Sequence, residues 1–213
     1  MFRMIQIDQL STHLQLRLKV PLPGESAHAM AHIKPFSKVT YPYTIENATP
    51  AAVLILLFPQ KDDICFFLTQ RTETVEHHKG QISLPGGMRE NGEQLYETAI
   101  RETEEEIGVP KNDIHLLGNL TPFFTPVTGF MIHPFIGWTN PKPKTKIHDK
   151  EVEILFTASI NDLIHDNTLK TENWRIRGYD ATVPFYNFDG HKVWGATAAI
   201  LSEFKLILQE LKF

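Results

Sequence analysis

The sequence GMRENGEQLYETAIRETEEEIGV, residues 87–109, predicts one helix preceded by a loop. Asn91 can cap the start of this helix, and Gln94, three residues further on, can complete a capping box. Gly108 supplies a left-handed stop, and Pro110 prevents the helix from continuing. Local signals therefore bound this helix at both ends.

Three glutamates of this helix, Glu102, Glu105 and Glu106, are spaced i, i+3, i+4 and share one stripe of its surface. Like charges at this spacing repel each other, and acids in the last turns face the negative end of the helix dipole. A pattern that is unfavourable for the helix itself indicates a compensating function. A divalent cation would remove the repulsion, because Mg²⁺ and Mn²⁺ prefer carboxylate oxygens. A solvated charged face is the alternative.

The same stretch resembles the Nudix box, Gly-x5-Glu-x7-Arg-Glu-U-x-Glu-Glu-x-Gly-U, in which U is usually aliphatic. The matching positions are Gly87, Glu93, Arg101, Glu102, Glu105, Glu106, Gly108 and Val109, and Thr103 occupies a U position. The resemblance implies a loop–helix–loop that binds Mg²⁺ or Mn²⁺ in an enzyme that hydrolyses nucleoside diphosphate derivatives. It also implies that Glu102, Glu105 and Glu106 are metal ligands, and that Glu93 and Arg101 form a structural ion pair.

The segment before the box resembles the extra signature of coenzyme A pyrophosphatases, Leu-Leu-Thr-x-Arg-Ser/Ala-x3-Arg-x3-Gly-x3-Phe-Pro-Gly-Gly. The corresponding residues run from Phe67 through Arg71 and Gly80 to Gly87, with the spacing preserved. This resemblance implies hydrolysis of coenzyme A or acyl-coenzyme A to adenosine 3′,5′-bisphosphate and (acyl-)4′-phosphopantetheine. Glu76 replaces the second arginine of the signature, and an acid there would repel the 3′-phosphate. That departure favours ADP-ribose, dinucleotides or another nucleoside diphosphate derivative as alternative substrates.

Further candidate residues would contact the substrate or the attacking water. Arg71 is expected to contact the substrate, and the consecutive glycines Gly86 and Gly87 allow the backbone to approach a ligand closely. Removal of a proton from the attacking water needs a base. Either a glutamate of the box or Glu151, which matches a downstream acid of the subgroup, can serve. A surface charge is the alternative interpretation of Glu151.

A catalytically idle Nudix domain that binds a nucleotide or a protein is a hypothesis from a different functional class. Such domains typically lose acids of the box, whereas this sequence keeps all of them. The residues therefore favour an enzyme.

Short apolar runs and turn signals predict strands on both sides of the box helix. The expected strands are 51–58, 64–70, 81–84, 114–121, 131–139, 151–156, 183–188 and 192–194. The first two are expected to form a hairpin over 52–70, and Asp189-Gly190 is a hairpin turn signal between the last two. Helices are expected within 4–19 and 196–211 and near 160–165. Residues 123–130 are expected to be a turn-rich linker, and residues 166–180 are polar and are assigned no element. This order predicts an α/β fold, a mixed-sheet α/β/α sandwich, which the Nudix resemblance also implies.

The composition is that of an ordinary globular chain, with 213 residues, 42% hydrophobic, 22% charged and a net charge of −4. The negative charge argues against nonspecific binding to nucleic acid. No apolar stretch reaches the roughly 18 residues of a membrane span, and the N-terminus lacks a signal-peptide pattern. We therefore expect a cytoplasmic protein with a small-molecule nucleotide substrate. Cys65, the single cysteine, lies in an apolar run and is expected to be buried.

Two parts are expected along the chain. Residues 1–50 form an N-terminal helix and an irregular arm that packs on the main domain, and residues 51–213 form the Nudix hydrolase domain. The arm, residues 20–50, is rich in Pro, Gly, Ser and His, and His28 and His32 are expected in a surface loop or short helix rather than in a metal pair. Two roles are open for the arm, contact with a second subunit in a homodimer and coverage of the site.

Overall fold

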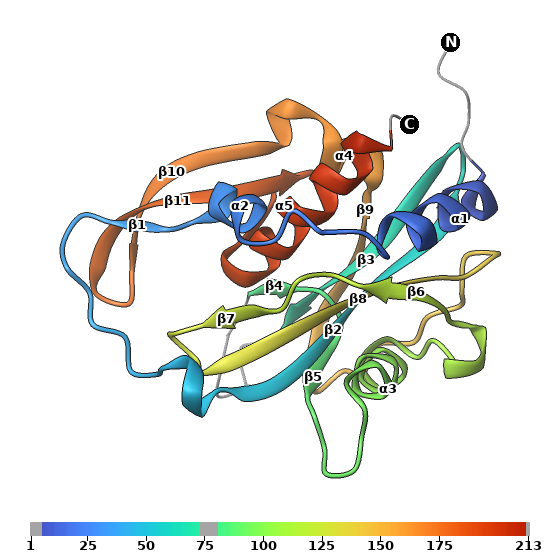
Figure 1. Cartoon of the computed structure of the whole chain (residues 1–213), viewed down its shortest axis with the longest axis horizontal. Helices are drawn as coiled ribbons and strands as arrows, with labels where there is room; N and C mark the ends of the chain where they lie inside the picture. The colour runs from blue at the N-terminus through green and yellow to red at the C-terminus, as the bar shows by residue number, and fades with distance from the viewer. Residues whose placement is uncertain (1–5, 73–80, 212–213) are drawn as a thin grey trace.

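The large sheet is the centre of the fold in the computed structural model, which describes residues 6–72 and 81–211. Its main path runs β4-β3-β2-β8-β6, with β5 paired to β2, β7 to β8 and β9 to β3 (Figure 1). The strands are β2 (Thr49–Gln60), β3 (Asp63–Arg71), β4 (Ile82–Ser83), β5 (Gly86–Met88), β6 (His115–Asn119), β7 (Phe123–Thr125), β8 (Phe130–Trp138) and β9 (Val152–Ser159). The sheet is mixed, because β2 and β8 are parallel while the other pairs are antiparallel.

The hairpin predicted over residues 52–70 is confirmed as β2 and β3, which pair from Leu57↔Phe66 to Gln60↔Asp63. Both strands are buried over most of their length because helices cover both faces of the sheet. The apolar, β-branched and aromatic run of β2 is therefore a strand and not a buried helix.

The helices form a layer on each face of the large sheet (Figure 1). They are α1 (Ile7–Arg17), α2 (Glu25–His28), α3 (Leu95–Ile107), α4 (Ile160–Ile164) and α5 (Gly195–Glu210). The helix α3 packs on one face with Leu54, Leu56 and Phe67 of the sheet. On the other face, α1, α4 and α5 share a larger core with Ile55, Phe66 and other sheet residues. This arrangement confirms the predicted α/β/α sandwich.

A second, smaller sheet was not predicted. It contains β1 (Lys34–Pro35), β10 (Leu169–Ile176), β11 (Tyr179–Phe188) and β12 (His191–Trp194). No strand was predicted in the polar stretch 166–180, but β10 lies there and pairs with β11 along eight residues although most of its side chains are exposed. Because β10 is polar and most of its side chains are exposed, its sequence lacks the apolar pattern that predicts a strand. The predicted turn at Asp189-Gly190 is confirmed, with positive φ at both residues.

The prediction for residues 123–130 was partly wrong, because Phe123–Thr125 form the strand β7 before the chain turns into β8. The helix α5 packs against β11 and β12 of the small sheet and against β7 of the large sheet. Its contacts therefore join the two sheets. Within the described residues, no helix has the length and apolar character that are needed to cross a membrane.

Candidate active site

The helix α3 carries the acidic stripe, and its start differs from the prediction. Gln94, not Asn91, is the N-cap residue, and the Gln94 backbone N–H donates to Oε2 of Glu97 at 2.8 Å. Asn91 instead belongs to a turn with Gly92, whose φ is +88°. The predicted end is confirmed, since Gly108 has a left-handed φ of 72°.

Thr103, the departure from the aliphatic pattern of the box, is fully buried in α3. Its hydroxyl donates to the carbonyl oxygen of Ala99 at 2.7 Å, one turn earlier. This hydrogen bond satisfies the hydroxyl inside the helix, so a threonine is tolerated at a position that faces the core.

The three glutamates of the stripe lie at different depths. The Glu106 residue is 2% exposed, whereas the side chains of Glu102 and Glu105 are 15% and 58% exposed. Oε2 of Glu106 accepts the backbone N–H of Gly86 at 3.2 Å. A Cβ atom on Gly87 would lie 2.5 Å from Cδ of Glu102, so the absence of a side chain there is what makes room for this carboxylate. Gly87 therefore lets β5 pack directly against Glu102 of α3, whereas a Cβ atom on Gly86 would meet Ala52 and Val53 of β2.

Arg101 forms ion pairs with three carboxylates on this side of α3. Its Nε donates to Oε1 of Glu93 at 2.6 Å, and its Nη1 donates to Glu102 at 2.9 Å and to Glu105 at 3.0 Å. Nη2 donates to the carbonyl oxygen of Met88 at 3.1 Å. The hydrogen bond from Arg101 lowers the pKa of Glu93 to about 2, below its ordinary value of 4.5. One guanidinium thus ties the loop before α3, the strand β5 and the acidic stripe together.

The electrostatics of Glu102 connect it with Glu151. Burial raises the pKa of Glu102, the neighbouring Arg101 opposes this rise, and the negative charges of Glu105 and Glu151 add to it. The side chain of Glu151 is 43% exposed and lies 3.5 Å from Nδ1 of His148. Glu102 and Glu151 also line the same cavity.

The donor chemistry of this cluster suits a hard divalent cation, because Glu102, Glu105 and Glu106 offer only carboxylate oxygens. Among residues 6–72 and 81–211, no group of three acidic, histidine or cysteine side chains is already arranged as a metal site. Glu102 and Glu105 turn toward Arg101, and Glu106 turns toward Gly86. Each of these hydrogen bonds engages one oxygen of its carboxylate, namely Oε1 of Glu102, Oε2 of Glu105 and Oε2 of Glu106.

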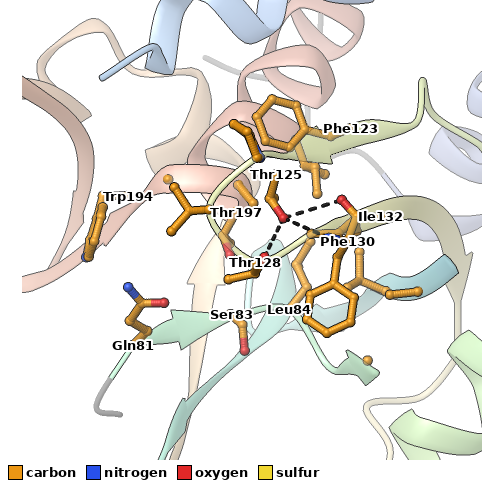
Figure 2. A pocket seen from close by; sticks show the side chains of 18 of the residues that line it. Gln81, Ser83, Leu84, Phe123, Thr125, Thr128, Phe130, Ile132, Trp194 and Thr197 are labelled. Carbon is orange, nitrogen blue, oxygen red and sulfur yellow. Dashed lines mark hydrogen bonds between the residues drawn. The ribbon is translucent and has the colours of Figure 1, made fainter. Parts of the chain in front are cut away.

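A cavity of about 1010 Å³ extends from this cluster into the space between the two sheets. Its acidic end is lined by Gly86, Gly87, Met88, Arg89, Glu90, Glu102 and Glu151. Figure 2 shows the walls of the cavity, with side chains from β4, from β7 and its connection to β8, from the end of β12 and from the start of α5. Most of the lining in this part is apolar, for example Leu84, Phe123, Phe130 and Ile132.

Of the predicted site residues, Gly86, Gly87, Glu102 and Glu151 line this cavity. The backbone of Arg71 ends β3 and pairs with Val152, which follows Glu151. The side chain of Arg71, and residues 73–80 with Glu76 and Gly80 of the signature, lie outside the described part of the structure.

Sequence reasoning missed one part of the cavity wall. His28 was expected in a surface loop or short helix. It lies in the short helix α2, but it is only 7% exposed and lines the cavity with other residues of the arm. The sequence did contain an indication of Glu203, the partner of His28. Glu203 is a single acid within the apolar run of α5, a position at which a charge is buried only if it is paired.

The NUDIX domain family matches residues 48–180, which is more than half of the chain. The protein belongs to the Nudix family. Relatives named "Uncharacterized Nudix hydrolase NudL" share this assignment. The one from Photorhabdus laumondii is 29% identical over 159 residues, which cover 74% of this chain and 84% of that protein. The one from Enterobacter sp. strain 638 is 30% identical over 161 residues, covering 75% and 83%.

The Nudix fold is also found in the solved structure of the Nudix hydrolase RenU from M. smegmatis. It superposes with a TM-score of 0.55 at 15% identity, covering 78% of this chain and 88% of that chain. The predicted family and fold class are therefore confirmed. As a Nudix hydrolase, the protein is a pyrophosphohydrolase of nucleoside diphosphate derivatives, and enzymes of this family generally use divalent metal cations.

Proposed function

We propose that this Nudix hydrolase cleaves the diphosphate of coenzyme A or acyl-coenzyme A, giving adenosine 3′,5′-bisphosphate and (acyl-)4′-phosphopantetheine. The observation that carries the proposal is the second signature, Phe67 to Gly87, whose spacing is preserved. Its two described ends are neighbours in the fold, because Thr69 pairs with Ser83 and Gln70 with Ile82. The second end leads into Gly86 and Gly87 at the acidic end of the cavity.

In this proposal Glu102, Glu105 and Glu106 hold Mg²⁺ or Mn²⁺. The cation would neutralise the anionic diphosphate oxygens that otherwise shield phosphorus from attack and would acidify a water. Arg101 and Glu93 keep the loop before α3 against the acidic stripe. Gly86 and Gly87 bring the β5 backbone next to the carboxylates, and Arg71 contacts the substrate.

The reaction breaks the P–O bond of the anhydride as the oxygen of water bonds to phosphorus, and the water loses a proton to a base. Glu151 is a candidate for this base, since it lines the cavity and its carboxylate is partly exposed to solvent. A glutamate of the box that is released from the cation is the second candidate. The two phosphorylated halves then leave the cavity.

Glu76 favours a second candidate function, hydrolysis of ADP-ribose or of a dinucleotide. In this sequence the acid replaces the arginine of the coenzyme A signature and would repel a 3′-phosphate. The 3′-phosphate is therefore the group whose effect on the rate separates the two functions.

Product analysis tests the proposal. The purified protein is incubated with Mg²⁺ or Mn²⁺ and, separately, with coenzyme A, acyl-coenzyme A, dephospho-coenzyme A, ADP-ribose, NADH and diadenosine polyphosphates. The expected result is that 4′-phosphopantetheine appears from coenzyme A faster than any other substrate is cleaved. Cleavage of ADP-ribose or a dinucleotide with coenzyme A untouched would refute the coenzyme A assignment and leave the Nudix chemistry intact.

A further inference from the structure

Part of the cavity wall lies outside the matched Nudix domain. The family match begins at residue 48, but Glu25, His28, Ala29, Ala31, His32 and Ile33 of the arm line the cavity. On another side, Thr197 and Ile200 of α5 line it from beyond residue 180, where the match ends. The space available to a substrate therefore depends on how these flanking segments are held.

Glu203 of α5 joins these segments. Its side chain is fully buried, which is costly for a charge unless hydrogen bonds replace water. Oε1 accepts the Gly24 backbone N–H at 2.9 Å and the Thr121 hydroxyl at 2.7 Å. Oε2 accepts the Thr121 backbone N–H at 3.0 Å and lies 3.3 Å from Nε2 of His28. Burial alone would raise the pKa of Glu203, but these hydrogen bonds outweigh it and lower the pKa.

The partners of Glu203 come from both sides of the cavity. Gly24 and His28 begin and end the turn of α2, and Thr121 lies just before β7. The ring of His28 packs edge-on against Phe123 of β7, with 5.2 Å between ring centroids. Since His28 and Phe123 both line the cavity, the carboxylate of Glu203 fixes two of its walls relative to α5.

We propose that residues 24–33 of the arm are a substrate-contacting wall of the active site and that Glu203 is the positioning residue that holds this wall in place. The inference rests on the proposed function only in placing the substrate in this cavity. The group that reaches the arm is the part of the substrate farthest from the diphosphate, because Glu102 and Gly87 occupy the other end. The wall consists of alanine, isoleucine and histidine side chains and one acid, Glu25, so it suits an uncharged organic group better than a second diphosphate.

Glu203→Gln tests the positioning role. The substitution keeps the size of the side chain but replaces one acceptor oxygen by an NH₂ donor. A backbone N–H, that of Gly24 at one oxygen or that of Thr121 at the other, then faces a donor and loses its acceptor. Glu210→Gln is the matched control, because Glu210 lies on the same helix, pairs with Arg17 at 2.6 Å and does not line the cavity. Steady-state kinetics are measured with coenzyme A and with ADP-ribose for the wild type and each variant.

For whichever substrate is cleaved, Glu203→Gln should raise KM at least tenfold while kcat stays within threefold, and Glu210→Gln should change neither. A raised KM with an unchanged kcat indicates that substrate binding is weakened by a displaced wall, while the chemical step is intact. An unchanged KM together with a lower Tm would reduce Glu203 to a structural residue and overturn the proposal. Failure to cleave coenzyme A would instead refute the proposed function alone.

Ala29→Phe provides a second test that does not depend on a buried charge. Ala29 is exposed and lines the cavity, so a phenyl group there should be tolerated by the fold and should fill the arm end of the cavity. We expect KM to rise at least tenfold with kcat within threefold. A KM equal to that of the wild type in a folded Ala29→Phe variant would overturn the proposal, even if Glu203→Gln does not fold.

Discussion

Replacement of Gly87 by alanine would test whether the position of the Glu102 carboxylate controls the reaction. A Cβ atom at residue 87 would lie 2.5 Å from Cδ and Oε1 of Glu102 and 2.7 Å from Oε2. Carbon atoms that are not bonded rest about 3.5–4.0 Å apart. The carboxylate of Glu102 would therefore have to move by about 1 Å, the difference between these spacings.

We expect Gly87→Ala to lower the rate of hydrolysis much more than the stability of the fold. A misplacement of about 1 Å can cost about 100-fold in an active site, which corresponds to about 2.7 kcal/mol of transition-state stabilisation. The obstacle is the end of a side chain and not backbone, so the fold should adjust. We expect a fall in Tm of no more than about 4 °C, the shift that about 1 kcal/mol produces in a chain of this size.

Gly92→Ala is the matched control. Gly92 also lies in the loop before α3, and a Cβ atom there would meet nothing within 4 Å, but its φ of +88° is strained for alanine. This variant should lose about 1 kcal/mol of stability and keep its activity. The measurements are the rate of Mg²⁺-dependent hydrolysis and the thermal unfolding curve. Gly87→Ala with more than a third of the wild-type kcat/KM would refute the reasoning about Glu102.

Three further predictions concern α3, the loop before it and the buried thiol. Glu106→Gln should retain the native circular dichroism spectrum, because its amide oxygen can still accept the Gly86 N–H, but should abolish metal-dependent turnover; full activity would remove Glu106 from the mechanism. Glu93→Gln should lower the free energy of unfolding relative to the wild type. The difference should be largest above pH 4.5 and should shrink as the pH falls toward 2, because Arg101 lowers the pKa of Glu93 to about 2 in the fold. Urea unfolding at pH 7 and pH 3 checks this, and equal losses of unfolding free energy at both values would contradict it. Burial raises the pKa of the Cys65 thiol to about 11, so a thiol reagent at pH 8 should label the unfolded chain and spare the native one.

The parts of the fold that follow from short stretches of sequence were predictable. The end of α3 is set by Gly108, because glycine adopts a left-handed φ at little cost. The hairpin of β2 and β3 follows from two apolar runs separated by a short polar turn. The start of α3 was misplaced by three residues because Asn91 and Gln94 are both plausible caps, and the hydrogen bond from Gln94 to Glu97 decides between them.

The sequence also supplied the site's chemistry but not its geometry. The Nudix box names Glu93 and Arg101 together, and the structure adds that the same guanidinium reaches Glu102, Glu105 and the carbonyl oxygen of Met88. A one-dimensional pattern gives residue types and spacing, whereas the distance between a helix and a neighbouring strand depends on how both pack on the core.

The sequence by itself determined the family, the box helix and most strands, because each is marked by a short local pattern: the spaced residues of the box, the glycine stop of the helix, and the apolar runs of the strands. The tertiary structure alone decided the small sheet, in which the polar strand β10 is held by backbone pairing to β11. It alone decided that His28 is buried against Glu203, 175 residues further along the chain. Contacts across such separations leave no periodic pattern in the sequence, and they shape the wall of the cavity where the substrate is proposed to bind.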